Sequence, residues 1–281
     1  MRSAWGGYTR PMRTYFITGT SSGIGRELTE QLLERGDRVV ATLRDVRRLD
    51  DLARRYPDLR TARLDVVDGD AVRRAIHEAS VSLGRIDVVV NNAGYGLFGA
   101  AEETSDAQIL RQIETNLLGS MHVVRAAMPY LRRQGGGRIV QISSEGGQTT
   151  YPGFSAYHAS KWGIEGFIET VAQEGATFGI ACTIVEFGPT ATNFGAALAH
   201  ADTIDAYEAS PVGRLRRALR DGTGFAERDD PATVARAIIA ASQEDPAPLR
   251  RVIGTYARER VRASLVARLS SIDARTAAAE L

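Results

Sequence analysis

The sequence predicts an α/β protein built on a single Rossmann-like, doubly wound sheet of seven parallel strands with helices on both faces. Short runs rich in Val and Ile recur along the chain, and segments whose apolar residues have helical spacing separate them. Strands that are apolar throughout are typical of parallel sheets, because helices cover both faces of such a sheet. Crossovers between parallel strands are almost always right-handed, which fixes the winding.

The seven predicted strands are spread evenly over most of the chain. They cover residues 14–18, 38–43, 61–66, 86–92, 138–143, 181–187 and 251–254. Helices are predicted between them, for example over residues 26–35 and 70–79, where apolar side chains share one helix face. Strand and helix therefore alternate almost throughout, as a doubly wound sheet requires.

One catalytic domain is predicted over residues 13–254, preceded by a flexible arm over residues 1–12 and followed by a helical extension over residues 255–281. The alternation breaks over residues 193–228, where no strand is predicted and the turn signals SPVG and DGTG occur. We expect this segment to be an insertion that covers the substrate site.

The composition excludes several classes of partner. Basic and acidic residues are balanced, 35 against 34, so no net field draws the chain to nucleic acid or to an anionic membrane. No apolar stretch approaches the roughly 20 residues of a membrane span, and the first residues lack a secretory signal. Cys182, the single cysteine, lies in an apolar run and predicts a buried thiol. We expect a cytoplasmic protein without a metal, because the four histidines lack metal-ligand spacing.

The first predicted strand ends in a glycine-rich loop, TGTSSGIG, at residues 18–25. Its glycines allow a tight turn and a close backbone approach, and free N–H groups at the start of the following helix face an anion. A plain glycine turn is the alternative interpretation. We expect the loop to hold the phosphates of a dinucleotide through Gly19, Ser21, Ser22, Gly23, Ile24 and Gly25.

Arg44 indicates which dinucleotide is bound. It follows the second predicted strand, where a carboxylate would accept hydrogen bonds from the ribose of NAD. A guanidinium at this position suits a 2′-phosphate instead, so NADP(H) is favoured over NAD. The alternative is that Arg44 is a surface residue, one of 34 arginines in the chain.

Two further strand ends carry candidate contacts to the adenosine. After the third strand, Asp65, next to Val66, can accept from the adenine amino group or cap a turn. The NNAG motif at residues 91–94 ends the fourth strand and suits a loop behind the ribose or the adenine. Its candidate contacts are Asn92, Ala93 and Gly94.

Lys161 is the single lysine of the chain and lies in the segment SAYHASKWG. Arginine replaces lysine poorly where the geometry is tight, so we expect Lys161 to make specific contacts. Tyr157 precedes it by four residues, so phenol and ammonium project from one face of the predicted helix. A nearby cation stabilises phenolate and lowers the pKa of the tyrosine, which suits proton exchange. Ser144, at the end of a strand, offers a hydroxyl to a substrate oxygen. Glu145, beside it, is a charged residue in a pocket that we expect to be mostly apolar.

These motifs together resemble the short-chain dehydrogenase/reductase family over about residues 13 to 254, most closely its bacterial branch similar to hydroxysteroid dehydrogenases. TGTSSGIG, NNAG, Asn116 in ETNLLG, Ser144, and Tyr157 with Lys161 occur in the family's order. The resemblance implies a Rossmann-type fold with Tyr157 as general acid/base and Ser144 orienting the reacting oxygen. It also implies that Lys161 binds the nicotinamide ribose and that Asn116 supports a proton-relay water.

The resemblance extends to the segment after the sixth strand and to assembly. Gly188, Thr190 and Thr192 are expected beside the nicotinamide, although Phe187 stands where the family usually has proline before that glycine. Family members commonly form homodimers or homotetramers by pairing the helices expected here over residues 117–134 and 156–178. Apolar spacing supports such a face at Ile164, Phe167, Ile168 and Val171.

We therefore expect an NADP(H)-dependent oxidoreductase that interconverts a ketone and a secondary alcohol on a medium-sized, largely apolar small molecule. The alternatives are a dinucleotide-binding sensor or scaffold without turnover, in which damage to the catalytic residues is expected, and a sugar-nucleotide epimerase or dehydratase with a related fold. Candidate pocket residues, several of which core packing explains equally well, are Tyr95, Leu97, Phe98, Gln148, Tyr151, Phe187 and Phe194.

Overall fold

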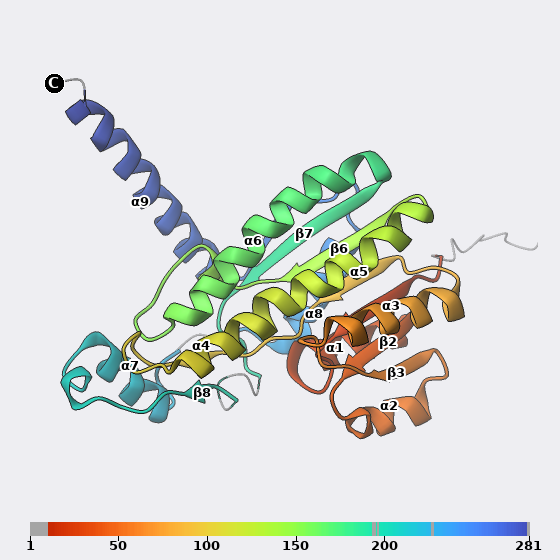
Figure 1. Cartoon of the computed structure of the whole chain (residues 1–281), viewed down its shortest axis with the longest axis horizontal. Helices are drawn as coiled ribbons and strands as arrows, with labels where there is room; N and C mark the ends of the chain where they lie inside the picture. The colour runs from red at the N-terminus through yellow and green to blue at the C-terminus, as the bar shows by residue number, and fades with distance from the viewer. Residues whose placement is uncertain (1–10, 193–194, 196, 226–227, 280–281) are drawn as a thin grey trace, which may run out of the picture.

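The computed structural model describes residues 11–192, 195, 197–225 and 228–279. Its centre is a sheet of seven parallel strands in the order β3-β2-β1-β4-β6-β7-β9 (Figure 1). The strands are β1 (Thr14–Thr18), β2 (Arg38–Leu43), β3 (Leu59–Arg63), β4 (Val88–Asn91), β6 (Gly137–Ile142), β7 (Ile180–Phe187) and β9 (Arg250–Ile253). The predicted fold class is confirmed, because the strand order reverses direction between β1 and β4 as in a doubly wound sheet.

Helices cover both faces of this sheet. The layer in front in Figure 1 consists of α3 (Gly69–Leu83), α5 (Gly119–Arg133) and α6 (Ser155–Gly175). The opposite layer consists of α1 (Gly23–Glu34), α2 (Asp50–Arg55) and α8 (Pro231–Gln243). Each layer encloses its own apolar cluster, so the core is divided in two by the sheet.

The central strand β1 explains why the strands are apolar throughout. Phe16 packs into the cluster beneath α3, α5 and α6, whereas Tyr15 and Ile17 pack into the cluster beneath α1 and α8. All three side chains are at most 1% exposed. A strand buried on both faces has no position for a solvated polar residue.

The third strand ends earlier than predicted. It was expected over residues 61–66, but β3 spans Leu59–Arg63. The carbonyl oxygen of Asp65 accepts a hydrogen bond from the backbone N–H of Asp68, and its carboxylate accepts from that of Val67 at 3.3 Å. A turn therefore begins at Asp65 and lifts the chain away from the sheet.

The prediction that residues 193–228 contain no strand is wrong. The short strand β8 (Ala199–His200) pairs in parallel with β5 (Leu97–Phe98), and the helix α7 (Pro211–Arg220) follows it. The pairing joins segments about a hundred residues apart in sequence, so no local pattern signals it. Within this segment, residues 193, 194, 196, 226 and 227 lie outside the described part of the chain.

The apolar stripe that suggested an oligomer interface belongs to the protein's own core. Ile164, Ile168 and Val171 are at most 5% exposed and pack in the cluster beneath α5 and α6. Of the four predicted residues, Phe167 alone is partly exposed. Their spacing therefore reports burial against the sheet, and the oligomeric state stays a prediction.

The chain ends in the helix α9 (Thr255–Ala279), which projects away from the sheet in Figure 1. In the described ranges, no helix combines the length and the apolarity that crossing a membrane requires. The same ranges contain no group of three or more His, Cys, Asp or Glu side chains placed to hold a metal ion. Cys182 is buried as predicted, and burial raises the pKa of its thiol to about 12.

Candidate active site

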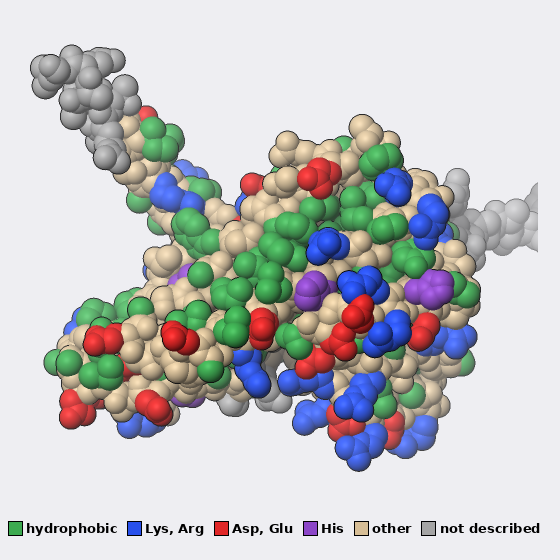
Figure 2. Space-filling model, in the orientation of Figure 1, with side chains coloured by type: hydrophobic (Ala, Val, Ile, Leu, Met, Phe, Trp, Pro, Cys, Tyr) green, Lys and Arg blue, Asp and Glu red, His purple; other side chains and the backbone are tan. Residues whose placement is uncertain are grey.

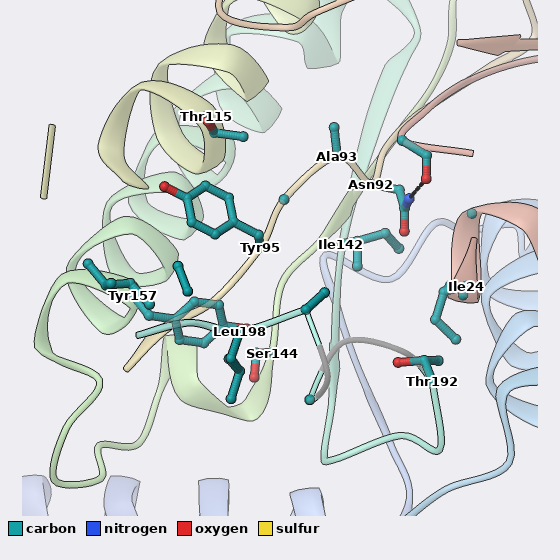
Figure 3. Close-up of a pocket in the computed structure, with 18 of the residues that line it drawn as sticks. Ile24, Asn92, Ala93, Tyr95, Thr115, Ile142, Ser144, Tyr157, Thr192 and Leu198 are labelled. Carbon is teal, nitrogen blue, oxygen red and sulfur yellow. Dashed lines mark hydrogen bonds between the residues drawn. The ribbon is translucent and has the colours of Figure 1, made fainter. Parts of the chain in front are cut away.

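A cavity of about 1330 Å³ lies at the carboxyl ends of the parallel strands, where doubly wound proteins bind their ligands. Figure 3 shows Ser144, Tyr157 and Leu198 in one part of it, and Ile24 and Thr192 in another. Apart from Asn116, every site residue predicted from the sequence lines the cavity: Gly19, Ser21, Ser22, Gly23, Ile24, Gly25, Arg44, Asp65, Val66, Asn92, Ala93, Gly94, Ser144, Tyr157, Lys161, Gly188, Thr190 and Thr192.

The glycine-rich loop has a shape that larger residues would destroy. Gly19 and Gly23 have φ angles of 71° and 56°, which disfavour residues with a side chain. A Cβ atom on Gly19 would lie 2.7 Å from the Cα of Ala93, and one on Gly25 would lie 2.4 Å from the carbonyl oxygen of Gly19. The loop leads into α1, whose first three residues line the cavity, and Ser22 makes no side-chain cap there. This cradle fits a pyrophosphate.

Asn92 fastens the NNAG segment to the glycine loop. Its side-chain amide donates to the carbonyl oxygens of Thr18 and Gly19, both at 2.9 Å. The backbone N–H groups of Asn92 and Ala93 donate to the Thr18 hydroxyl oxygen at 3.0 Å. The side chain of Asn92 therefore holds two loops of the cavity together.

At the predicted adenosine end, Arg44 and Asp65 line the cavity after β2 and β3. Arg44 is exposed and forms no ion pair with any residue that the structure describes. Asp65 caps its own turn, as one of the two sequence interpretations proposed, and still borders the cavity.

Ser144, Tyr157 and Lys161 converge from two elements. Ser144 follows β6, whereas Tyr157 and Lys161 lie one turn apart on α6 and are 9% and 8% exposed. The side chains of Ser144 and Tyr157 share a hydrogen bond. The Lys161 Nζ atom donates to the Ile142 carbonyl oxygen at 3.0 Å and lies 5.8 Å from the centre of the Tyr157 ring.

The expected lowering of the Tyr157 pKa by Lys161 is not what the structure displays. Burial raises the pKa of Tyr157 above its ordinary value, and the hydrogen bond with Ser144 opposes this only in part. Burial also lowers the pKa of Lys161 to about 8, while the charge of Glu165 works in the opposite direction. The ammonium donates to a backbone carbonyl, and its charge is not among the main causes that shift the Tyr157 pKa, so desolvation dominates.

Asn116 lies behind the cavity wall. It is 2% exposed and belongs to a π-helical turn, Glu114–Leu118. Its side chain exchanges hydrogen bonds with the backbone N–H and carbonyl of Tyr95 at 3.1 and 2.9 Å, and donates to the Ser160 hydroxyl at 3.3 Å. Ser160 in turn donates to the Tyr157 carbonyl oxygen at 2.7 Å. Asn116 thus ties the loop after β4 to the turn of α6 that carries Tyr157.

The segment after β7 forms another wall. A Cβ atom on Gly188 would lie 3.0 Å from the ring of Tyr256 on α9, so this wall is packed against the C-terminal helix. Thr192 borders the start of α1, because a Cβ on Gly23 would lie 3.5 Å from its side chain. Arg228, which sequence reasoning missed, also lines the cavity and carries no distinctive sequence signal.

The cavity is lined by some, but not all, of the predicted pocket residues. Tyr95, Leu97, Tyr151 and Phe187 line the cavity, whereas Phe98 and Gln148 do not, and Phe194 lies outside the described residues. The prediction was wrong for Phe98 because that ring is 1% exposed in the core beneath the cavity. Apolar lining residues that the sequence did not single out are Phe154, Leu198, Leu219 and Phe225.

The fold and the site define a doubly wound α/β protein whose cavity is bordered by a glycine-rich loop and by a serine, a tyrosine and a lysine. A family model described as short chain dehydrogenase matches residues 13–203. The chain belongs to the short-chain dehydrogenase family, whose members are oxidoreductases.

Individual relatives agree with this assignment. The chain is 36% identical over 249 residues to the oxidoreductase BOA17 of Botryotinia fuckeliana, which covers 88% of this chain and 90% of the relative. It is 38% identical over 190 residues to human retinol dehydrogenase 8, covering 65% and 60% of the two chains. A short-chain dehydrogenase structure from Streptomyces avermitilis superposes with a TM-score of 0.88 at 35% identity, covering 96% and 98%. More distant structures of this fold were solved with NADP or with NAD, so the fold alone does not choose the cofactor.

Proposed function

We propose that the protein is an NADP(H)-dependent oxidoreductase that interconverts a ketone and a secondary alcohol on a medium-sized, largely apolar small molecule. The observation that carries the proposal is that Ser144, Tyr157 and Lys161 border the same cavity as the glycine loop. A sensor or scaffold without turnover has no need of a hydroxyl, a phenol and an ammonium at one point.

The residues along the cavity suit each part of the cofactor. The loop at residues 18–25 and the N-terminus of α1 would hold the pyrophosphate, and Arg44 a 2′-phosphate. Asp65 and the NNAG segment would border the adenosine. Lys161 would bind the nicotinamide ribose, with the further contacts Gly188, Thr190 and Thr192 along the ring. A bound nicotinamide cofactor supplies the donor or acceptor of the hydride that a ketone and an alcohol exchange.

The side chains of this protein manage the substrate oxygen and its proton. Burial keeps the Tyr157 phenol protonated at neutral pH, which suits a group that donates a proton to a ketone oxygen. Ser144 lies within hydrogen-bonding reach of Tyr157 and would hold the same oxygen during the transfer. The apolar walls of the cavity would exclude water from this point.

We also propose that two copies of the chain pair through the outer faces of α5 and α6, and that the protein works in the cytoplasm. Figure 2 shows hydrophobic side chains gathered over these two helices. Leu118 and Phe178, which flank this face, are 40% and 43% exposed. A Cβ atom on Gly166 would meet open space, so another helix can approach closely there.

A turnover screen of ketones with NADPH and of alcohols with NADP tests the reaction. Tyr157→Phe should bind the cofactor within a few-fold of the wild type but lose turnover, because the cavity survives and the proton donor does not. Cofactor binding, measured by calorimetry, is the control for folding. Substantial turnover by the purified variant would contradict the assigned role of Tyr157.

A further inference from the structure

We propose that Glu145 is a positioning residue that directs the hydroxyl proton of Ser144, so that the protonation state of its carboxyl group decides whether Ser144 can donate to the substrate oxygen. The inference rests on the proposed ketone and alcohol chemistry. Glu145 stands directly after Ser144 and opens a short 3-10 turn, η3 (Glu145–Gly147), at the end of β6.

The carboxylate of Glu145 is buried and bound by two hydroxyl groups. Its side chain lines the cavity, although the residue is only 3% exposed. The Ser144 hydroxyl donates to Oε2 at 2.7 Å, and the Tyr151 hydroxyl donates to Oε1. Ser144 and Tyr151 both line the cavity as well, so the three side chains form a row along its wall.

The hydrogen bond to Glu145 uses the only proton of the Ser144 hydroxyl. A serine hydroxyl has one proton to donate and two acceptor positions. Its proton goes to Glu145, and its oxygen accepts from the backbone N–H of Gly146 at 3.1 Å. Tyr157 shares a further hydrogen bond with the Ser144 side chain. As long as Glu145 is ionised, Ser144 has no proton to offer a ketone oxygen.

Protonation of Glu145 reverses this arrangement without moving any heavy atom. A neutral carboxyl group donates its own proton to the Ser144 oxygen, which frees the Ser144 proton to point at the substrate. A ketone oxygen would then accept hydrogen bonds from both Ser144 and Tyr157, which stabilise the negative charge that develops on this oxygen during reduction. The proton on Glu145 is not transferred, so the proton that the ketone oxygen receives still comes from Tyr157.

The surroundings of Glu145 favour the neutral form. Burial raises the pKa of its carboxyl group above the ordinary value, and the hydrogen bonds from Ser144 and Tyr151 oppose this only in part. The titratable or charged groups on the loop, strand and helices packed against η3 are Tyr151, Tyr157, His158, Lys161, Glu165, Glu186, Tyr256, Arg260 and Arg268.

The cations among these groups are engaged elsewhere. Lys161 donates to the Ile142 carbonyl oxygen, and Arg268 donates to Gln148. Arg260 lies 5.1 Å from the centre of the Tyr151 ring and forms no ion pair with Glu145. His158 binds the Gly146 carbonyl oxygen at 2.8 Å, and burial lowers its pKa. Within the described part of the chain, no cation pairs with the Glu145 carboxylate, so it can change its charge.

Glu145→Gln tests the inference, because its amide can donate to Ser144 as a protonated carboxyl would. In the wild type, kcat/KM for ketone reduction should fall as Glu145 ionises, by about tenfold per pH unit beyond that point. The variant should lack this fall and hold its rate up to about pH 8, where Lys161 loses its charge. Tyr151→Phe is the matched control: it keeps the carboxylate but removes one bond to the charged form, so the fall should move to higher pH.

A carbon-13 NMR titration of the glutamate side chains gives a readout that needs no substrate. Two carboxyl groups should titrate above the ordinary range in the wild type, because burial also raises the pKa of Glu186 to about 7. The signal of Glu145 is the one that shifts further upward in Tyr151→Phe and is missing in Glu145→Gln. Identical pH profiles in active wild type and active Glu145→Gln would overturn the inference and leave the proposed function standing. Absence of turnover in the wild type with every substrate would overturn the proposed function and this inference with it.

Discussion

The Lys161 ammonium donates to the Ile142 carbonyl oxygen at 3.0 Å, two residues before Ser144. The contact is buried, and it links the helix that carries Tyr157 to the end of the strand that precedes Ser144. The single lysine of the chain therefore connects α6, which carries Tyr157, to the end of β6, which precedes Ser144. It also places a positive charge beside these two residues.

Lys161→Arg should lose at least about 100-fold in kcat/KM, although it keeps the charge. The guanidinium is larger and planar, so it cannot reach the Ile142 carbonyl and leave the cavity wall in place, and a displacement of about 1 Å at a reacting centre has this effect. Steady-state kinetics with any active substrate measure the loss. A variant with wild-type rates and an unchanged thermal unfolding curve would show that the lysine has no special geometry.

Lys161→Met should make the protein more stable at neutral pH while removing activity. The pKa of Lys161 is about 8 in the folded protein and 10.5 in an unfolded chain, which corresponds to roughly 3 kcal/mol of destabilisation when both states are charged. Between these two values the unfolded chain binds more protons, so the wild type gains stability as the pH rises. The advantage of the variant in free energy of unfolding should shrink from pH 8 to pH 10.5, and denaturant titrations at several pH values measure it.

Arg44→Ala should weaken NADP binding by roughly 10- to 150-fold, the range of a charge-assisted hydrogen bond, and leave NAD binding nearly unchanged. A second substitution, of the neighbouring Leu43 to aspartate, is not useful. Leu43 is 3% exposed in the core, so an aspartate there would bury a charge. Arg47→Ala is the matched control, since Arg47 is exposed and paired with Asp45. Calorimetry at two salt concentrations measures the preference, which added salt should reduce. Equal losses in both variants would make Arg44 an ordinary surface arginine.

Gly166→Arg should convert the proposed dimer to a monomer. The substitution meets open space in the isolated chain, so it should not disturb the fold, but it places a long charged side chain where two α6 helices would approach. Val81→Arg, at a 69% exposed position on α3, is the control. Light scattering at micromolar concentration measures the mass of each. A monomeric wild type would contradict the proposed assembly.

The sheet and the glycine turn into α1 were predictable because their signals are local. Apolar runs mark strands such as β1, and the spacing of Gly19, Gly23 and Gly25 marks the turn into α1. Such patterns reflect steric limits within a few residues, and they need no knowledge of distant partners.

The remaining features depend on contacts between distant segments. The apolar positions Ile164 and Ile168 have the same spacing whether they face a neighbouring molecule or the sheet, and the structure places them against the sheet. The carbonyl partner of Lys161 and the backbone partners of Asn116 lie on other elements, so no motif reveals them. The pKa of Tyr157 likewise follows from burial, which the spacing of Tyr157 and Lys161 does not report.

A Cβ atom on Gly188 would lie 3.0 Å from the ring of Tyr256, so α9 supports one wall of the cavity from behind, and Ser264 on the same helix donates to the Gln148 carbonyl oxygen at 2.7 Å. The seven strands of the sheet precede α9 in the chain, so this support is synthesised only after the sheet. A substitution at Tyr256 would therefore act on the cavity indirectly, through Gly188.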